Sequence, residues 1–195
     1  MKKNISTVIL AAGESKRMGK AKLLLPYKQT TIIEDVVHNC LSSKSDKVIV
    51  VLGAHREKIL PLIKHLPVSA VYNSDYKKGM LSSIQSGIRS LSADTQAIVF
   101  ALSDQPGIPG EVIDRLIENF DKTKKGILLP VFLQRRGHPI LIDLKYREEI
   151  LNLSSDIGLR GLVHEHSKDI LEVPVDCPNI LKDIDTPADY KRSRH

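Results

Sequence analysis

The sequence predicts an α/β fold, a three-layer sandwich in which a mostly parallel sheet lies between two layers of helices. Two observations support this prediction. Short apolar runs rich in Val, Ile and Leu alternate along the chain with longer segments whose apolar residues recur at helical spacing. The chain has 195 residues with neither an internal repeat nor a clear linker, so we expect one domain spanning residues 1–195.

The strands are expected to be short and buried. The first run, residues 7–10, is β-branched and has no polar interruption. The run at residues 97–102 is the most apolar in the chain, which favours a central place in the sheet. Strands are predicted at residues 7–10, 47–52, 69–72, 97–102, 126–130, 138–142 and 170–173. The run at 138–142 is more irregular than the others.

The segments between the strands have helical periodicity. Thr30 or Thr31 can cap the first helix, and Pro61 inside the second predicts a break or kink there. Helices are predicted at residues 31–41, 55–65, 80–91, 111–120, 146–153 and 158–166, with a last one beginning at Pro187. Strands joined through helices run parallel, and ligands of such sheets bind beyond the carboxyl ends of the strands.

The composition favours an anionic small molecule as the partner. The net charge is +6 and the isoelectric point is about 9.3. Aromatic residues make up only 4% of the chain and Trp is absent, which argues against a base-stacking platform. No zinc-finger or RNA-binding pattern is present, so we expect no nucleic-acid partner. Phosphate-rich small molecules fit the charge at least as well.

The cysteines and the hydropathy pattern favour the cytoplasm. Cys40 lies among apolar residues of a helical pattern, and Cys177 stands beside Pro178 in a late loop. They form neither a CxxC motif nor a disulfide framework, so a reducing compartment is expected. No apolar segment approaches the about 18 residues of a membrane span, and the first apolar run is too short for a signal peptide.

The loop after the first strand, residues 10–22, has the features of a phosphate site. Ala11, Ala12 and Gly13 leave room for a ligand against the backbone. Four cations follow within seven residues: Lys16, Arg17, Lys20 and Lys22. The spacing matches neither a P-loop nor the three-glycine dinucleotide fingerprint. The sequence therefore predicts a phosphate loop of another kind, with a solvated basic turn as the alternative.

Carboxylates suited to a magnesium ion follow two other segments. Asp104 comes directly after the run at 97–102, and Asp183 and Asp185 occupy alternate positions, so they share a face of an extended segment. Mg²⁺ binds through one or two carboxylates, with phosphate and water as its other ligands. The alternatives are structural. Asp104 could be an N-cap or a turn residue before the next helix, and Asp185 could cap the helix that Pro187 begins.

Two further groups are candidates for ligand contact. The helix that begins after Gly79 carries Ser82 and Ser83 near its start, where hydroxyl and N–H donors can approach a nucleotide. His138 lies in a basic loop, although a structural histidine is an equal alternative. His164 and His166 lie two residues apart on a predicted helix, so they face apart and form no zinc pair.

Residues 10–19, LAAGESKRMG, together with Lys22, resemble the LAAGxSxRMGxxK motif of nucleotidyltransferases. The matching downstream blocks are Gly79-Met80-x-Ser82-Ser83-Ile84, Leu102-Ser103-Asp104-Gln105-Pro106, Arg136-Gly137-His138-Pro139, Gly158-x-Arg160 and Asp183-Ile184-Asp185-Thr186-Pro187. In this order they make the chain similar to molybdenum cofactor cytidylyltransferases of the MocA type and to PucB accessory proteins of xanthine dehydrogenase. The resemblance covers nearly the whole chain and places it in the MobA-like superfamily.

The resemblance implies a Rossmann-like, GT-A-like nucleotide-diphospho-sugar transferase fold and a Mg²⁺-dependent reaction. CTP and molybdopterin-bound molybdenum would give molybdopterin cytosine dinucleotide and pyrophosphate. The implied nucleotide contacts are Leu10, Ala11, Ala12, Gly13, Gly79, Ser82 and Ser83; the implied triphosphate ligands are Arg17 and Lys22; the implied metal ligands are Asp104 and Asp185; and the residues facing the pterin are His138 and Arg160. Arg17, Lys22 and Asp104 would be catalytic.

The chemistry of this reaction suits the residues, because an ionised phosphate acceptor needs no strong base, and cations offset the repulsion between the two anions. Guanylyl relatives, MobA, open with Leu-Ala-Gly-Gly, so Ala12 favours CTP over GTP.

Other acceptors, such as a sugar phosphate or a methylerythritol-type alcohol, remain alternatives. So does a non-catalytic carrier that hands the cofactor to a dehydrogenase. Transient contact with a molybdenum hydroxylase such as xanthine dehydrogenase is a further expectation.

Overall fold

The computed structural model describes residues 3–193, so the outer two residues at each end of the predicted domain lie outside the described part. The strands are β1 (Ile5–Ala11), β2 (Pro26–Tyr27), β3 (Thr30–Thr31), β4 (Lys47–Leu52), β5 (Ser69–Tyr72), β6 (Ala97–Leu102), β7 (Ile127–Phe132), β8 (Arg135–Arg136), β9 (Ile140–Asp143) and β10 (Ile170–Pro174). The α-helices are α1 (Ile32–Leu41), α2 (Arg56–Ile63), α3 (Met80–Arg89), α4 (Gly110–Lys122), α5 (Arg147–Asn152), α6 (Gly158–Glu165) and α7 (Pro187–Ser193).

The central sheet confirms the predicted α/β class. Its strand order is β10-β7-β9-β6-β1-β4-β5, with β8 paired to β7. The ladders β6-β1-β4-β5 and β10-β7 are parallel, whereas β9 is antiparallel to both β6 and β7. Because β9 runs in the opposite direction, its first residues lie at the edge of the sheet where β6 and β7 end. This reversal brings the loop before β9 to the ligand-binding edge.

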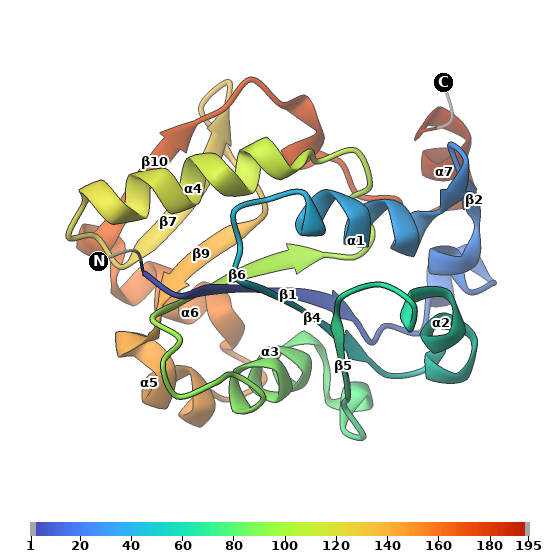
Figure 1. Ribbon diagram of the computed structural model, residues 1–195, viewed down its shortest axis with the longest axis horizontal. Coiled ribbons are helices and arrows are strands. Elements are labelled where there is room, and N and C mark those ends of the chain that lie inside the picture. Colours follow the sequence, from blue (N-terminus) through green and yellow to red (C-terminus); the bar gives the residue numbers. More distant parts are fainter. Residues whose placement is uncertain (1–2, 194–195) are drawn as a thin grey trace.

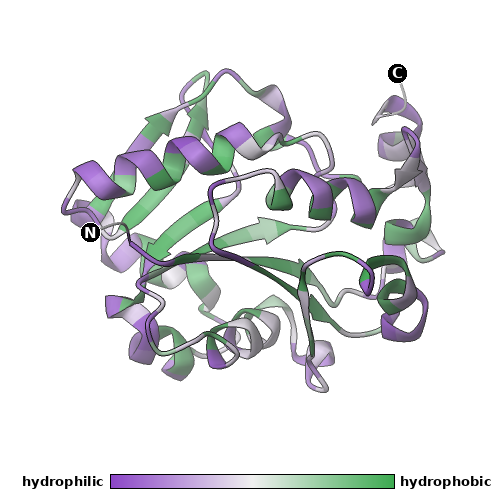
Figure 2. Ribbon diagram, viewed as in Figure 1, coloured by the Kyte–Doolittle hydropathy of each residue, from purple (hydrophilic) through white to green (hydrophobic). Residues whose placement is uncertain are grey.

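Helices cover both faces of the sheet. In Figure 1, α1 and α4 lie on one side of the strands, and α3, α5 and α6 on the other. The side chains of β1 alternate between the two cores: Ile5 and Ile9 pack with α1, α2 and α4, and Val8 packs with α3 and α5. Figure 2 shows hydrophobic strands between helices whose outer surfaces are hydrophilic. In the described part of the chain, no helix has the length and hydropathy needed to cross a bilayer.

The first helix begins as predicted, with Thr31 as its cap. The Glu34 amide donates to Thr31 Oγ1, and the Thr31 amide donates to the Glu34 carboxylate, which forms a capping box. Of the break or kink predicted at Pro61, the break is absent, because α2 continues through this residue to Ile63. Pro61 has no backbone N–H, so the helix lacks the hydrogen bond to the carbonyl of Glu57, whose side chain is exposed. The buried side chains of Ile59 and Ile63 hold the helix on the sheet.

Asp169 joins three segments at the amino end of β7. Its Oδ2 accepts hydrogen bonds from the Tyr146 hydroxyl at 2.6 Å and the Gly126 amide at 2.9 Å, and it lies 2.7 Å from Lys145 Nζ. Burial acts to raise the pKa of Asp169, but these three donors outweigh it, so the pKa lies below its ordinary value of 3.8. The ionised carboxylate therefore stabilises the folded state.

We expect Asp169→Asn to lower the free energy of unfolding at pH 7 by about 1 kcal/mol, because a neutral amide replaces an ionised acceptor. The wild-type advantage is present above pH 3.8 and is lost as the pH falls through the lowered pKa. Urea denaturation at pH 7 and pH 3 measures this difference. The exposed Asp121→Asn is the control. A difference that persists or grows at pH 3 would contradict the assignment.

Candidate active site

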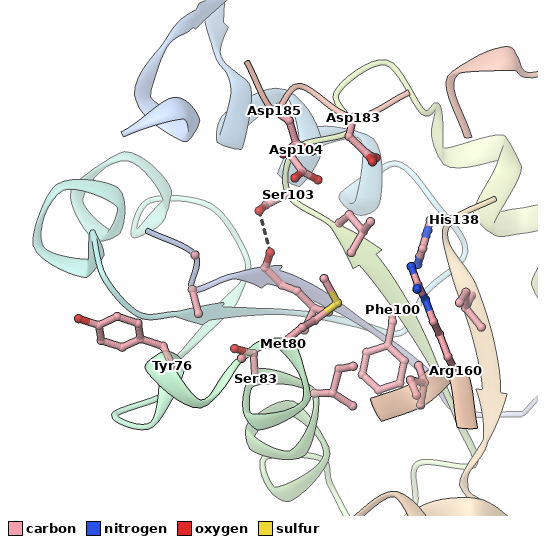
Figure 3. A pocket seen from close by; sticks show the side chains of 18 of the residues that line it. Tyr76, Met80, Ser83, Phe100, Ser103, Asp104, His138, Arg160, Asp183 and Asp185 are labelled. Carbon is pink, nitrogen blue, oxygen red and sulfur yellow. Dashed lines mark hydrogen bonds between the residues drawn. The ribbon is translucent and has the colours of Figure 1, made fainter. Parts of the chain in front are cut away.

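A cavity of about 1120 Å³ opens at the carboxyl edge of the sheet (Figure 3). It lies where the sequence predicts a ligand site, beyond the ends of β1 and β6. Its polar and charged lining residues are Glu14, Ser15, Lys16, Arg17, Lys22, Tyr76, Lys77, Ser83, Ser103, Asp104, Arg136, His138, Arg160, His164, Ser167, Asp183 and Asp185. Six of these side chains are cationic and four are anionic, so the cavity suits a ligand with several negative charges.

The loop after β1 is folded into two short turns that expose its backbone to the cavity. Ser15 and Gly19 adopt left-handed conformations, with φ of 55° and 69°, at the two ends of a 3₁₀ turn over Lys16–Met18. Met18 is buried and anchors this turn. A second 3₁₀ turn, Lys22–Leu24, buries Leu23 in the core, which directs Lys22 inward. Ala12 and Gly13 line the cavity as predicted.

Lys22 lies between two carboxylates that come from distant parts of the chain. Its Nζ atom is 2.6 Å from Asp104 Oδ2 and 2.9 Å from Asp185 Oδ1. Arg17 contacts the other oxygen of Asp185, with Nη2 at 2.9 Å from Oδ2. Burial acts to lower the pKa of Lys22, but attraction from both carboxylates outweighs it, so the pKa is raised. All four residues were predicted for the site, and the structure brings them together.

Neither of the two carboxylates caps a helix. α4 begins only at Gly110, and the start of α7 is capped by a reciprocal pair between Thr186 and Asp189. The Ile184 amide donates to the carbonyl oxygen of Asp104 at 2.9 Å, which joins the two acidic loops. Asp104 thus lies in a turn after β6, as one of the structural alternatives has it, whereas the helix-cap alternatives do not apply. Both side chains pair with cations of the loop after β1.

Asp183, the third carboxylate, has a different partner. Gln105 Nε2 donates to Asp183 Oδ1 at 2.7 Å. Burial and repulsion from Asp104 raise the pKa of Asp183, although the Gln105 bond opposes this. Gln105 is 4% exposed and was missed as a site residue, because nothing in the sequence shows which acidic segment it meets.

The start of α3 confirms one serine of the predicted pair as a lining residue. Ser83 is buried at the cavity wall, and Gly79 lies beside it with φ of 98°. Ser82 was expected there too, but it does not line the cavity, because its hydroxyl donates to the carbonyls of Asp75 and Gly79. Asn73 Nδ2 donates to both serine hydroxyls, a positioning role that sequence reasoning missed.

Ala11 is the second predicted contact that the structure places elsewhere. It is the last residue of β1, and its side chain packs in the core beneath α1 and α4, whereas Leu10 on the opposite face lines the cavity. The reason is the alternation of side chains along a strand, which allows only one of two neighbours to face the ligand.

His138, in the loop before β9, and Arg160, on α6, lie side by side in the wall of the cavity (Figure 3). Burial lowers the pKa of His138, and the nearby Arg160 cation lowers it further against the attraction of Asp183 and Asp104. The imidazole is therefore neutral at neutral pH. A neutral ring beside an exposed guanidinium can bind an acceptor, but it is not a ready proton donor.

The cavity also has a large apolar wall that the sequence motifs did not predict. It comes from strands β6, β7 and β9 and from helices α3 and α6, with Phe100 between the two helices. The residues of this wall are Met80, Ile84, Phe100, Leu102, Leu129, Ile140, Leu159 and Val163. Phe100 and Leu102 share a strand face, which strand alternation indicates, but the packing of α3 and α6 around this face is a tertiary feature. The cavity thus joins a charged end to an apolar end.

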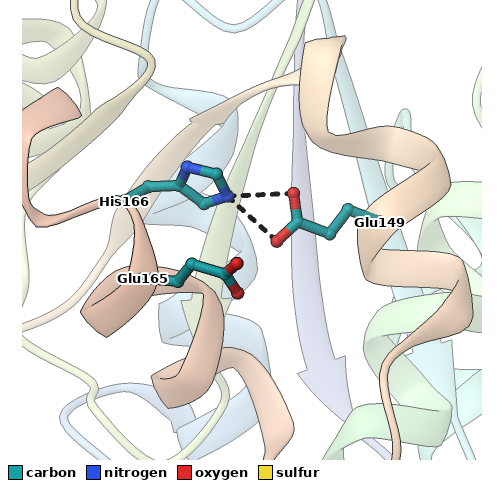
Figure 4. A group of neighbouring side chains, drawn as sticks. All are labelled: Glu149, Glu165 and His166. Atoms are coloured by element: carbon teal, nitrogen blue, oxygen red, sulfur yellow. Dashed lines mark hydrogen bonds and ion pairs between the residues drawn. The ribbon is translucent and has the colours of Figure 1, made fainter.

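His164 on α6 and His166, the residue after the end of this helix, face apart, as predicted. His164 lines the cavity, whereas His166 Nε2 lies 2.9 Å from both carboxylate oxygens of Glu149 on α5 (Figure 4). Glu165 completes a group whose donor atoms lie within 4.8 Å of one another. Because the imidazole already pairs with Glu149 and Glu165 is exposed, this group serves as a link between α5 and α6.

The donor set at Asp104 and Asp185 suits Mg²⁺, because two carboxylate oxygens converge on one cation and the basic loop beside them can supply phosphate ligands. A mostly parallel sheet, a basic loop after its first strand and paired carboxylates at the same edge together define the nucleotidyltransferase class of α/β proteins. The comparison with known proteins identifies the family: the chain belongs to the MobA-like NTP transferase domain family, which it matches over residues 7–180.

Relatives with several names align along nearly the whole chain. Nicotine blue oxidoreductase of Paenarthrobacter nicotinovorans is 31% identical, covering 93% of this chain and 92% of that protein. The molybdenum cofactor cytidylyltransferase of Escherichia coli is 26% identical, covering 95% and 93%. Purine catabolism protein PucB of Bacillus subtilis is 30% identical, covering 96% and 94%. Probable molybdenum cofactor guanylyltransferases also match, among them one of Mycobacterium marinum at 28% identity, covering 95% and 91%.

Solved structures show the same fold. The crystal structure of Rv0371c from Mycobacterium tuberculosis superposes with a TM-score of 0.89 at 27% identity, covering all of this chain and 98% of the other. A complex of the same protein with manganese has a TM-score of 0.82 at 26% identity, covering 98% of each chain. The chain thus has the fold and the sequence of a MobA-like NTP transferase domain, and its relatives include proteins named as cytidylyl and guanylyl transferases of the molybdenum cofactor.

Proposed function

We propose that this protein transfers CMP from CTP to the molybdopterin form of the molybdenum cofactor, giving molybdopterin cytosine dinucleotide and pyrophosphate in a Mg²⁺-dependent reaction. The observation that carries the proposal is the position of Lys22 between Asp104 and Asp185 beside the basic loop, inside a cavity that also has an apolar end. The charged end suits a triphosphate, and the apolar end suits a flat heterocyclic acceptor.

The charged end supplies what phosphoryl chemistry requires. Arg17 and Lys22 bind the β- and γ-phosphates, and the open backbone at Gly13 lets the triphosphate approach the loop. Asp104 and Asp185 would hold the Mg²⁺, which neutralises charge on the phosphates when it is bound. An oxygen of the acceptor phosphate forms the new bond to the α-phosphorus as the bond to the bridging oxygen breaks, and pyrophosphate leaves toward the cationic side chains.

The apolar end positions the acceptor. Its phosphate is already ionised, so the step requires no general base, in accord with a neutral His138. Arg160 attracts the anionic acceptor, and Phe100 forms part of the wall against which an aromatic ring system can pack. Alignment of the two substrates across one cavity then provides much of the rate enhancement.

Pyrophosphate release with molybdenum-loaded molybdopterin, Mg²⁺ and either CTP or GTP tests the choice of nucleotide. We expect release with CTP at least about 100-fold faster than with GTP, a ratio that hydrogen bonds to the base edge can provide. Ala12 and the cytidylyltransferase of Escherichia coli support CTP. Faster release with GTP would assign the protein to the guanylyl branch. Absence of release with either, despite nucleotide binding, would favour another acceptor or a carrier.

The relative named nicotine blue oxidoreductase suggests a redox reaction as the second candidate. Hydride transfer uses a nicotinamide or flavin cofactor, and the loop after β1 lacks the three-glycine dinucleotide fingerprint. Absorbance at the nicotinamide band during incubation with NADPH and a quinone-like dye separates the two functions, and we expect no oxidation above background. We also propose that the protein acts in the cytoplasm and hands its product to a molybdenum hydroxylase such as xanthine dehydrogenase, which is what the motif resemblance to PucB accessory proteins implies.

A further inference from the structure

The side chain of Lys22 occupies the point at which a bridging metal ion would bind. Its Nζ atom contacts one oxygen of each carboxylate, at 2.6 Å for Asp104 and 2.9 Å for Asp185. The second oxygen of Asp185 is taken by Arg17. Both carboxylates thus have cationic partners from the chain itself.

The ammonium group and a metal ion compete for the same oxygens. Mg²⁺ and Mn²⁺ bind carboxylate oxygens directly and carry two charges, so a second cation between the same two oxygens would be strongly repelled. The side chain of Lys22 is 13% exposed, which makes its pairing with the carboxylates stronger than a surface ion pair. A metal ion alone must therefore displace a well-held lysine that has no other anion to bind.

A nucleoside triphosphate removes this obstacle. Its phosphates carry several negative charges and, in the proposed reaction, bind beside the loop that holds Lys22. The lysine stem is long and flexible, so the ammonium group can exchange a carboxylate partner for a phosphate oxygen without movement of the backbone. The vacated carboxylates are then free for the metal ion that accompanies the triphosphate.

We propose that Lys22 is an exchangeable counter-ion, which occupies the metal position in the free protein and moves to the triphosphate when metal and nucleotide bind together. This inference rests on the proposed function, because it assumes that a nucleoside triphosphate and a divalent cation share the cavity. It deepens that function by making metal binding conditional on the nucleotide. The free protein is held in a form with low affinity for the metal ion.

Titration of the nucleotide-free protein with Mn²⁺, followed by calorimetry or by the electron spin resonance of free Mn²⁺, tests the proposal. Lys22→Met should bind Mn²⁺ about tenfold more tightly than the wild type, since no ammonium group then occupies the oxygens of Asp104 and Asp185 that Lys22 contacts. The same variant should bind CTP more weakly, because a phosphate ligand is lost. Lys58→Met is the matched control: Lys58 has the same charge, lies exposed on α2, does not line the cavity, and should leave both affinities within twofold.

Equal or weaker binding of Mn²⁺ to Lys22→Met than to the wild type would overturn the proposal. If that variant does not fold, the ammonium signal of Lys22 in ¹⁵N-labelled wild-type protein provides the test. The signal should shift on addition of CTP with Mg²⁺ and stay unchanged with the same concentration of Mg²⁺ alone. A shift with Mg²⁺ alone, or none with both, would overturn it. Dinucleotide formation by the wild type is a separate readout, so failure of the exchange can be distinguished from failure of the proposed function.

Discussion

Replacement of Asp104 by asparagine is expected to reduce the rate of pyrophosphate release at least about 100-fold, the effect typical of losing one charged group that stabilises a transition state. The substitution keeps the shape of the side chain but removes the negative charge that would hold the metal ion. It also leaves Lys22 with Asp185 as its remaining carboxylate partner. Nucleotide binding should weaken much less, because Arg17 and the open loop after β1 are unchanged.

Steady-state release of pyrophosphate and CTP binding, measured on the same preparation, separate these two effects. Asp176→Asn is the matched control, because Asp176 is exposed and does not line the cavity. It should leave the rate within twofold. A carrier without catalytic activity would show no turnover in the wild type and little change in nucleotide binding in the variant. An Asp104→Asn protein with more than about a tenth of the wild-type rate would contradict the role assigned to this carboxylate.

Replacement of Phe120 by alanine is expected to lower the free energy of unfolding by about 3–5 kcal/mol and the melting temperature by roughly 10 °C. Phe120 is 2% exposed and packs from α4 into the core that β1, α1 and α2 share. The ring is large and enclosed, so its removal leaves a cavity in addition to the loss of buried apolar area. Chemical denaturation and differential scanning calorimetry measure the loss.

Leu133→Ala is the matched control for this prediction. Leu133 is a large apolar residue that is 79% exposed in the turn between β7 and β8, so its truncation should change stability by less than about 0.5 kcal/mol. Comparing the two variants shows whether burial, rather than residue type, determines the decrease in the free energy of unfolding. Similar losses for both variants would mean that α4 does not pack on the sheet as described.

The sequence predicts the layers of this fold well because apolar periodicity is a local property. The strand at 97–102 and the capped helix after Thr31 occur with the expected bounds. The antiparallel direction of β9 was not predicted, since strand periodicity is the same in both directions. The two-residue strands β2 and β3 are too short to show any pattern. The helix through Pro61 depends on the packing of its neighbours, which local propensity does not contain.

The site was predicted in its residue types but not in its pairings. Lys22 is 82 residues from Asp104 and 163 from Asp185 along the chain, and nothing local indicates that the lysine lies between the two. Gln105 could be found only from its contact with Asp183. The displacement of Ser82 from the cavity follows from hydrogen bonds to the turn before α3, which compete with any ligand for its hydroxyl. The sequence indicated which residues belong to the site, but not the directions in which their side chains point.

The transfer of CMP to molybdopterin is the central claim, and mass analysis of the acceptor tests it most directly. Purified protein is incubated with CTP carrying ¹⁸O on its α-phosphate, Mg²⁺ and molybdenum-loaded molybdopterin, and the products are separated. The account predicts molybdopterin cytosine dinucleotide that retains the α-phosphate label, together with an equal amount of pyrophosphate. Free CMP with pyrophosphate, or an unmodified acceptor after complete binding of CTP, would contradict it.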